Sequence, residues 1–261
     1  MELEHLVQGK YYHIFNRGNN GCRLFYNQGD YEHFLHLYDK YITPVADTLA
    51  WALMGNHFHL LVYIKPNLIY KYALPEMTKN NRKVAGSDNR KWETMDLSGL
   101  WELGTGPDNI GKNHIIPVPH RHFAHLFNAY NRYLQVSTGR TGNLFERPFK
   151  RKWIDNEIYL KQAILYIHNN PVHHGFCEHP LEYPWTSYIT CTSEKPTRVK
   201  RDDILKLFGN REKFKHQHSG KMDIDEIEEW LEIKGHFDFA NDMPHTEYRM
   251  QTLTGPITST V

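Results

Sequence analysis

Two histidines, His57 and His59, stand two positions apart in an apolar segment that continues to Val62. In a β-strand, residues i and i+2 point to the same face, so the two imidazoles would project together with Phe58 on the opposite face. Two imidazoles on one rigid strand make half of a site for a divalent metal. The same pattern also occurs in ordinary buried strands, so a metal site requires a third ligand from elsewhere in the chain.

A second pair of chemically able side chains lies far downstream, where Tyr166 and Asn170 are four positions apart. On a helix this spacing places them on one face. The Asn170 amide oxygen can complete a set of three ligands that leaves open positions for a phosphate, and the Tyr166 phenol can act as a covalent nucleophile. Alone, the pair also fits a half-buried core tyrosine and a polar residue at a helix end before Pro171.

A basic stretch between residues 140 and 152 is the candidate surface for DNA. Its cationic side chains could follow a phosphate backbone, and Phe145 or Phe149 could stack on a base. The cations of this stretch, together with one near the first strand, are Arg17, Arg140, Arg147, Lys150, Arg151 and Lys152. The alternative is a solvated edge strand that its charges protect from aggregation.

The elements that would position these residues alternate between strands and helices. Hydrophobic periodicity predicts strands over 11–15, 48–54, 57–64 and 144–154, and helices over 30–42, 119–136 and 156–170. Asp30 is expected to cap the first helix, and Pro171 to stop the last. The short Gly55-Asn56 link predicts an antiparallel hairpin. The order β-α-β-β-α-β-α predicts an α+β, ferredoxin-like antiparallel sheet with helices on one face.

Two regions extend this compact pattern. An insert at about 67–116 is rich in Gly, Ser, Asp and Asn after possible helices over 70–74 and 76–84. An extension over 189–261 contains two short helical patterns, at 202–208 and 223–234. The second begins with Asp223 and has Glu226 three residues on, like a capping box. We therefore expect a core domain over 1–188 that carries the insert, followed by the C-terminal extension over 189–261.

Composition narrows the class of protein. With 261 residues, 40% of them hydrophobic, the chain can bury a full core, and a net charge of +1 requires any basic binding surface to be local. Three scattered cysteines argue against a disulfide framework or a cysteine zinc site. No segment approaches the roughly 20 apolar residues of a membrane span. These features predict a cytoplasmic protein.

The motifs resemble a known family. His57-Phe58-His59 after a Met-Gly-Asn turn resembles the histidine–hydrophobic–histidine motif of single-tyrosine transposases, the IS200-like group of HUH endonucleases. The block from Tyr166 to Gly175 resembles the Tyr-x-x-x-Asn-Pro-Val block of their REP-associated tyrosine transposase branch. Supporting matches bring the resemblance to roughly residues 11–188; they lie at 12–18 with Phe25, at 144–152 and at 183–188.

The resemblance implies an enzyme that cuts and rejoins single-stranded DNA beside hairpins. Carried over to this sequence, Tyr166 would attack a phosphate, form a 5′-phosphotyrosine and free a 3′-OH. His57, His59 and Asn170 would hold Mg²⁺ or Mn²⁺, with Asn170 where many insertion-sequence relatives have glutamine. The ion would polarise the scissile phosphate. Relatives act as monomers or homodimers, so the resemblance leaves the oligomeric state open.

Two other functions fit the same residues. A domesticated protein could bind hairpin DNA with this fold and no longer cut it. A metal hydrolase could use an activated water and leave Tyr166 as packing. The first would bind without cleavage, and the second would tolerate Tyr166→Phe.

Overall fold

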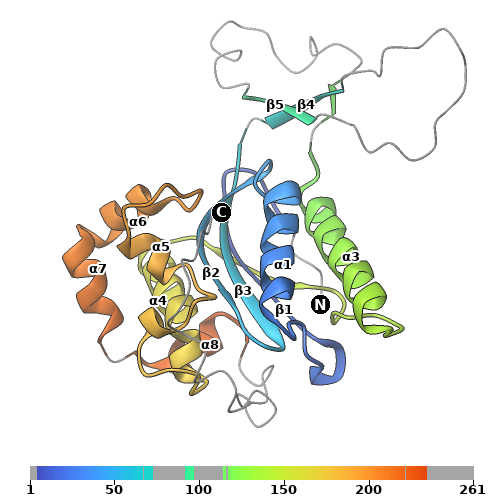
Figure 1. Ribbon diagram of the computed structural model, residues 1–261. Helices are drawn as coiled ribbons and strands as arrows, with labels where there is room; N and C mark the ends of the chain where they lie inside the picture. Colours follow the sequence, from blue (N-terminus) through green and yellow to red (C-terminus); the bar gives the residue numbers. More distant parts are fainter. Residues whose placement is uncertain are drawn as a thin grey trace, which may run out of the picture.

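A four-stranded antiparallel sheet forms the centre of the protein (Figure 1). The computed structural model describes the backbone of residues 5–66, 68–72, 92–96, 114–115, 117–220 and 222–233, and side chains in these ranges outside 68–115. The strands are β1 (Tyr11–Arg17), β2 (Ala46–Leu53), β3 (His57–Ile64) and β7 (Lys150–Ile154), in the order β2-β3-β1-β7. All neighbours are antiparallel. This is the sheet of the split β-α-β-β-α-β pattern, so the predicted α+β class is confirmed.

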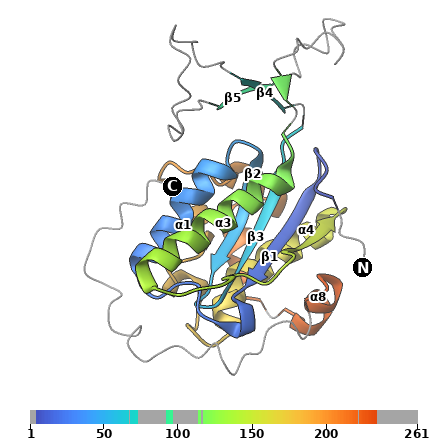
Figure 2. The same ribbon diagram turned by 90° about the vertical axis from the view of Figure 1, so that its right-hand side faces the viewer.

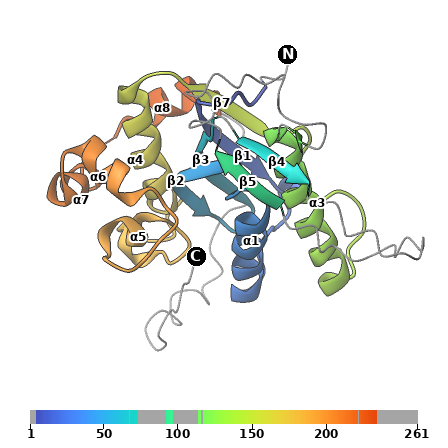
Figure 3. The ribbon, with the colours of Figure 1, turned by 90° about the horizontal axis from the view of Figure 1, so that it is seen from above.

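Helices cover both faces of this sheet. Helices α1 (Gln28–Tyr41) and α3 (Pro119–Thr138) lie on one face, as predicted, while α4 (Glu157–His173) lies on the other (Figure 3). The prediction of helices on one face therefore holds for α1 and α3 and fails for α4. Buried side chains of β3 point to both faces of the sheet, so both faces are covered by helices.

The start of α1 differs from the prediction because the cap lies three residues earlier. Asn27 is the N-cap, and its side chain accepts a hydrogen bond from the Asp30 backbone N–H. Asp30 occupies the third helical position, and its carboxylate accepts from the Asn27 N–H at 3.2 Å. The two residues thus form a capping box, in which Asp30 is the returning partner.

The fourth strand is shorter than expected. Only Lys150–Ile154 is regular strand. The preceding segment forms an isolated bridge between Phe145 and Gly18, and the Glu146 N–H donates to the Arg17 carbonyl. Pro148 lies in this segment and has no N–H to give to a ladder, which confines regular pairing to the residues after it.

Helix α4 continues past Pro171, which was expected to stop it. Proline removes one helical hydrogen bond, but here it lies within the last turn. The His174 N–H donates to the Asn170 carbonyl, and the Phe176 N–H donates to the Pro171 carbonyl. Those bonds close the helix end, so Asn170 stays on a regular helix rather than at its terminus.

The insert carries a small second sheet, visible above the main one in Figure 2. Its strands, in the order β5-β4-β6, are β4 (Leu68–Tyr72), β5 (Trp92–Asp96) and β6 (His114–Ile115). The helix predicted over 70–74 is wrong where the structure describes it, because 70–72 is strand. In the sequence Tyr70-Lys71-Tyr72 the lysine alternates with two aromatic residues, which suits the strand period of two. The helix predicted over 76–84 lies outside the described residues.

The C-terminal extension packs on the α4 face of the sheet. Its helices are α5 (Tyr188–Thr192), α6 (Arg201–Phe208), α7 (Arg211–His218) and α8 (Ile224–Trp230). The predicted helices at 202–208 and 223–234 correspond to α6 and α8, and Asp223 does cap α8; residues from 234 onward lie outside the described part. Helices α5 and α7 were not predicted. Phe208, Phe214 and Ile227 share one buried core with α4.

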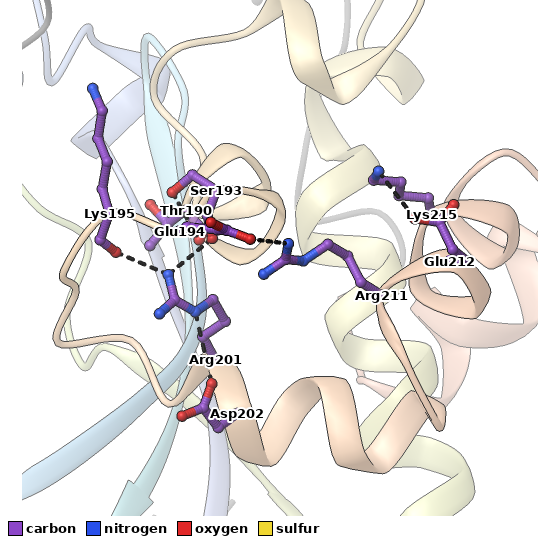
Figure 4. A network of polar contacts seen from close by, with 9 residues as sticks. All are labelled: Thr190, Ser193, Glu194, Lys195, Arg201, Asp202, Arg211, Glu212 and Lys215. Carbon is purple, nitrogen blue, oxygen red and sulfur yellow. Dashed lines mark hydrogen bonds and ion pairs between the residues drawn. The ribbon is translucent and has the colours of Figure 1, made fainter.

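Polar contacts tie the turns of the extension together (Figure 4). Arg201 Nη1 donates to the Ser193 carbonyl at 2.9 Å and to the Lys195 carbonyl at 2.8 Å. Arg211 Nη1 donates to Glu194 Oε1 at 3.1 Å. These bonds join α6 and α7 to the connection that follows α5, so this part of the extension is held as a unit.

Cys22, Cys177 and Cys191 are all free thiols. Among the described residues, no helix has the length and apolarity needed to cross a membrane.

Candidate functional site

Strand β3 presents the two histidines as its sequence requires. Phe58 packs against the α1 and α3 side, while His57 and His59 face α4. The centroids of the two imidazole rings are 5.2 Å apart. Both side chains are fully buried, so whatever they bind lies inside the protein.

Helix α4 brings Tyr166 and Asn170 to these histidines. Asn170 Oδ1 lies 3.1 Å from His57 Nε2, and the Tyr166 ring meets the His59 ring edge to face at 5.5 Å between centroids. The structure therefore gathers the four residues that sequence reasoning had selected from two segments more than a hundred positions apart. Their roles as ligands and nucleophile stay predictions.

Two further side chains, Asn56 and His13, orient the imidazoles. Asn56 Oδ1 lies 2.6 Å from His57 Nδ1, and an amide oxygen can only accept, so Nδ1 carries the hydrogen. His13 Nε2 lies 2.9 Å from His59 Nδ1 in a stack of nearly parallel rings. In both histidines the Nδ1 atom is thus occupied by a protein partner. This is how ligating histidines are usually held, with the other ring nitrogen left for a metal.

Burial favours the neutral form of His13 and His59. It lowers the pKa of His13 to about 3 and the pKa of His59 well below its ordinary value, and the neighbouring histidines lower the pKa of His59 further. A neutral imidazole retains the lone pair that a metal ligand needs.

The donor set fits a divalent cation that takes both nitrogen and oxygen ligands. His57 Nε2 and Asn170 Oδ1 lie 3.1 Å apart, so an imidazole nitrogen and an amide oxygen are adjacent there. Among the described residues, no group of three His, Cys, Asp or Glu side chains could hold a metal. A site at this place would take the Asn170 amide oxygen beside the two imidazoles.

Tyr166 is buried and hydrogen-bonded to the extension. Its hydroxyl donates to Glu228 Oε1 on α8 at 3.0 Å. Burial, and then the charge and the hydrogen bond of Glu228, raise the pKa of Tyr166 well above its ordinary value. The phenol is therefore protonated at neutral pH in this state.

Three histidines that flank the site take different positions. The ring centroids of His174 and His57 are 4.9 Å apart, and those of His173 and Tyr166 are 5.9 Å apart. Burial, and then His174, lower the pKa of His173 to about 4. His168 points away from the site, as its position two residues after Tyr166 predicts, and contacts the extension. His168 Nδ1 lies 2.9 Å from His218 Nε2.

The residues predicted to contact DNA do not form one surface. Lys150 and Lys152 pair with β1 residues whose side chains belong to the α4 face, whereas Arg151 pairs with Ile14 of the opposite face. Arg151 lies over the Phe149 ring, and Lys152 forms an ion pair with Glu232, just after the end of α8. Of the six cations, Lys150 and Lys152 share the face of the site.

The other three predicted DNA contacts lie in or beside the loops next to β1. Arg17 forms an ion pair with Glu146 at 3.5 Å, and Arg140 Nη1 donates to Cys22 Sγ. Arg147 is exposed. These side chains carry positive charge at the end of β1 where His57 pairs with Arg17.

The aromatic side chains expected to stack on a base are placed differently. Phe145 is buried and Phe149 packs against Phe123 and Phe127, so Phe145 is not available to a base in this state. The exposed aromatic side chain of β7 is Trp153, with 38% of its surface accessible. Lys10 Nζ lies 3.7 Å from the centroid of its ring.

Sequence reasoning missed three site residues: His13, Asn56 and Glu228. His13 and Phe15 stand two apart in β1, the same spacing that singled out His57 and His59, but its contact with His59 depends on the pairing of β1 with β3. Asn56 had been assigned only to the hairpin link. No local signal marks Glu228, which lies in a short amphipathic helix.

Comparisons with known proteins add one similarity. No protein-family model and no curated protein matches the chain. It is similar to a solved structure of a REP-associated tyrosine transposase bound to a REP hairpin, with 13% sequence identity and a TM-score of 0.45 over 75% of this chain and 88% of that one. Function therefore has to be inferred from the residues of the site itself.

Proposed function

We propose that this chain is a metal-dependent endonuclease and strand transferase for single-stranded, hairpin-associated DNA, which forms a 5′-phosphotyrosine through Tyr166. The observation that carries the proposal is the convergence of His57 and His59 from β3 with Tyr166 and Asn170 from α4 in one buried cluster. Packing alone does not require this combination, because buried polar groups are costly and four of them lie together here.

The chemistry of the cluster suits phosphoryl transfer. Tyr166 supplies the nucleophilic oxygen, and His57, His59 and Asn170 would hold Mg²⁺ or Mn²⁺. Such an ion, when bound, polarises the scissile phosphate and offsets the charge that develops on it. His13 and Asn56 hold the two imidazoles in one orientation. The cations at the end of β1 and on β7 would attract the phosphate backbone of a single strand.

The test is covalent capture of labelled DNA. Hairpin oligonucleotides labelled at the 5′ or the 3′ end are incubated with Mn²⁺ and the full chain, and products are separated on a denaturing gel. We expect label on the wild-type protein and none on Tyr166→Phe, with DNA binding retained. Tyr159→Phe is the matched control, because Tyr159 lies on the same helix but stacks on Trp230 outside the cluster.

A second candidate is a protein that binds hairpin DNA without cutting it. One observation favours it: Tyr166 is fully buried under the extension. It predicts binding across several hairpins with no covalent label for the wild type and no cleavage products. Free products that survive Tyr166→Phe would instead indicate a hydrolase that uses water.

A further inference from the structure

Helix α8 places a carboxylate directly on the hydroxyl of Tyr166. The Tyr166 Oη atom donates to Glu228 Oε1 at 3.0 Å, although the two residues are separated by 62 positions. Tyr166 is fully buried and only 8% of Glu228 is exposed. Removing a carboxylate from water costs free energy, so a buried carboxylate needs either a structural or a chemical reason.

The packing of α8 fixes the carboxylate there. Trp230 stacks on Tyr159 of α4, with ring centroids 3.8 Å apart and planes 9° from parallel. Ile227 and Leu231 are buried in the core that α4 shares with the extension. The hydrogen bond between Glu228 and Tyr166 therefore sits on a helix anchored on both sides of it, rather than on a mobile surface side chain.

A tyrosine nucleophile must lose its proton, and this phenol does not do so in advance. The ordinary pKa of a tyrosine hydroxyl is about 10, so at neutral pH the proton leaves as the new bond forms. General-base catalysis requires an acceptor within hydrogen-bond reach of that hydroxyl. Among the described residues, the Glu228 carboxylate is the group hydrogen-bonded to that hydroxyl.

We propose that Glu228 is the general base and acid of the tyrosine step; this inference rests on the function proposed above. As the Tyr166 Oη–P bond forms and the bond from phosphorus to the 3′ oxygen breaks, the Glu228 carboxylate takes the Oη hydrogen. The departing 3′ oxygen takes a proton from water and leaves as a 3′-OH. In the joining step a 3′-OH attacks the phosphotyrosine, its proton passes to water, and Glu228 returns its own proton to Oη.

Glu228→Gln is the decisive variant, because glutamine keeps the size and the accepting oxygen but cannot take the proton. Covalent adduct is measured under single-turnover conditions with labelled hairpin DNA and Mn²⁺, using the full chain. We expect the rate to fall about 10²–10⁴-fold while DNA affinity, measured separately with the same hairpin, is unchanged. Glu229→Gln, an exposed neighbour on α8, should react like the wild type.

A more acidic nucleophile provides a readout that a purely structural role would not change. Incorporating 3,5-difluorotyrosine at position 166 lowers the pKa of the phenol, which reduces the need for a base. We expect this substitution to recover part of the rate lost in Glu228→Gln. Glu228→Asp, which keeps a carboxylate on a shorter side chain, should retain more activity than the glutamine variant and serves if Glu228→Gln does not fold.

Each result decides between the two proposals. If the wild type and Tyr166→Phe both form no adduct, the function and the role of Glu228 fall together. If the wild type forms adduct and Glu228→Gln matches it, only the role of Glu228 is overturned. A faster Glu228→Gln also overturns it, since the contact would then hold the tyrosine back.

Discussion

Replacing His218 by phenylalanine breaks a buried chain of hydrogen bonds that joins α7 to α4. His218 Nδ1 donates to the Phe214 carbonyl at 2.7 Å, so its Nε2 accepts from His168 Nδ1 at 2.9 Å. His168 Nε2 in turn accepts from the Ser187 hydroxyl at 2.7 Å. His168 lies on the helix that carries Tyr166 and Asn170, so this chain of hydrogen bonds helps to fix the position of that helix.

The cost at neutral pH follows from the bonds removed. Phenylalanine has nearly the shape of histidine and lies among aromatic rings here, so the packing is largely kept. The hydrogen bonds of His218 to the Phe214 carbonyl and to His168 are lost, and the second loss leaves the His168 Nδ1–H without its acceptor. We expect a destabilisation of about 2 kcal/mol, or a fall in Tm of roughly 4–8 °C.

The cost should shrink in acid, because His218 itself makes the wild type acid-sensitive. Burial lowers the pKa of His218 to about 4, against about 6.5 for an unfolded histidine. The stability that depends on its neutral form is complete above pH 6.5 and is lost toward pH 4, by about 1.4 kcal/mol per pH unit. At pH 5 the wild type has lost about 2 kcal/mol through this residue, and His218→Phe cannot lose it.

Urea unfolding followed by circular dichroism measures the free energy of unfolding of the wild type and of His218→Phe at pH 7.5 and at pH 5. The difference between the wild type and His218→Phe should fall from about 2 kcal/mol to near zero. His216→Phe, an exposed histidine on the same helix, is the control and should change little at either pH. A difference that is equal at the two pH values would refute the reasoning, because His218 would then not be a neutral, buried member of the chain.

Two further predictions concern the site and the loop beside it. His13→Phe removes the partner of His59 Nδ1, so Mn²⁺ affinity measured by titration calorimetry should fall about 10–100-fold. His36→Phe, on the exposed side of α1, is the control and should bind Mn²⁺ as the wild type does. Equal affinities of His13→Phe and the wild type would show that His13 does not orient His59. A Cβ atom on Gly18 would overlap the backbone of the following loop, so Gly18→Ala should lower the free energy of unfolding by more than about 2 kcal/mol. Gly55→Ala, where a Cβ atom meets open space, should not lower it. A tolerated Gly18→Ala would contradict this loop geometry.

The sequence alone was sufficient for the local features of the site. The spacing of two residues placed His57 and His59 on one face of a strand, and the spacing of four placed Tyr166 and Asn170 on one face of a helix. These are consequences of the strand and helix periods, which depend only on neighbours in the chain. The order of strands and helices likewise predicted the antiparallel sheet.

Only the tertiary structure decided which distant groups meet. His13 reaches the site because β1 pairs with β3, and Glu228 reaches it because α4 covers the second face of the sheet and α8 packs on α4. The alternation of side chains along β7 divides the predicted DNA contacts between two faces. Periodicity tells which face of its own element a side chain occupies. The partner of that face is set by strand register and by burial of apolar surface over the whole chain, which no local pattern of residues contains.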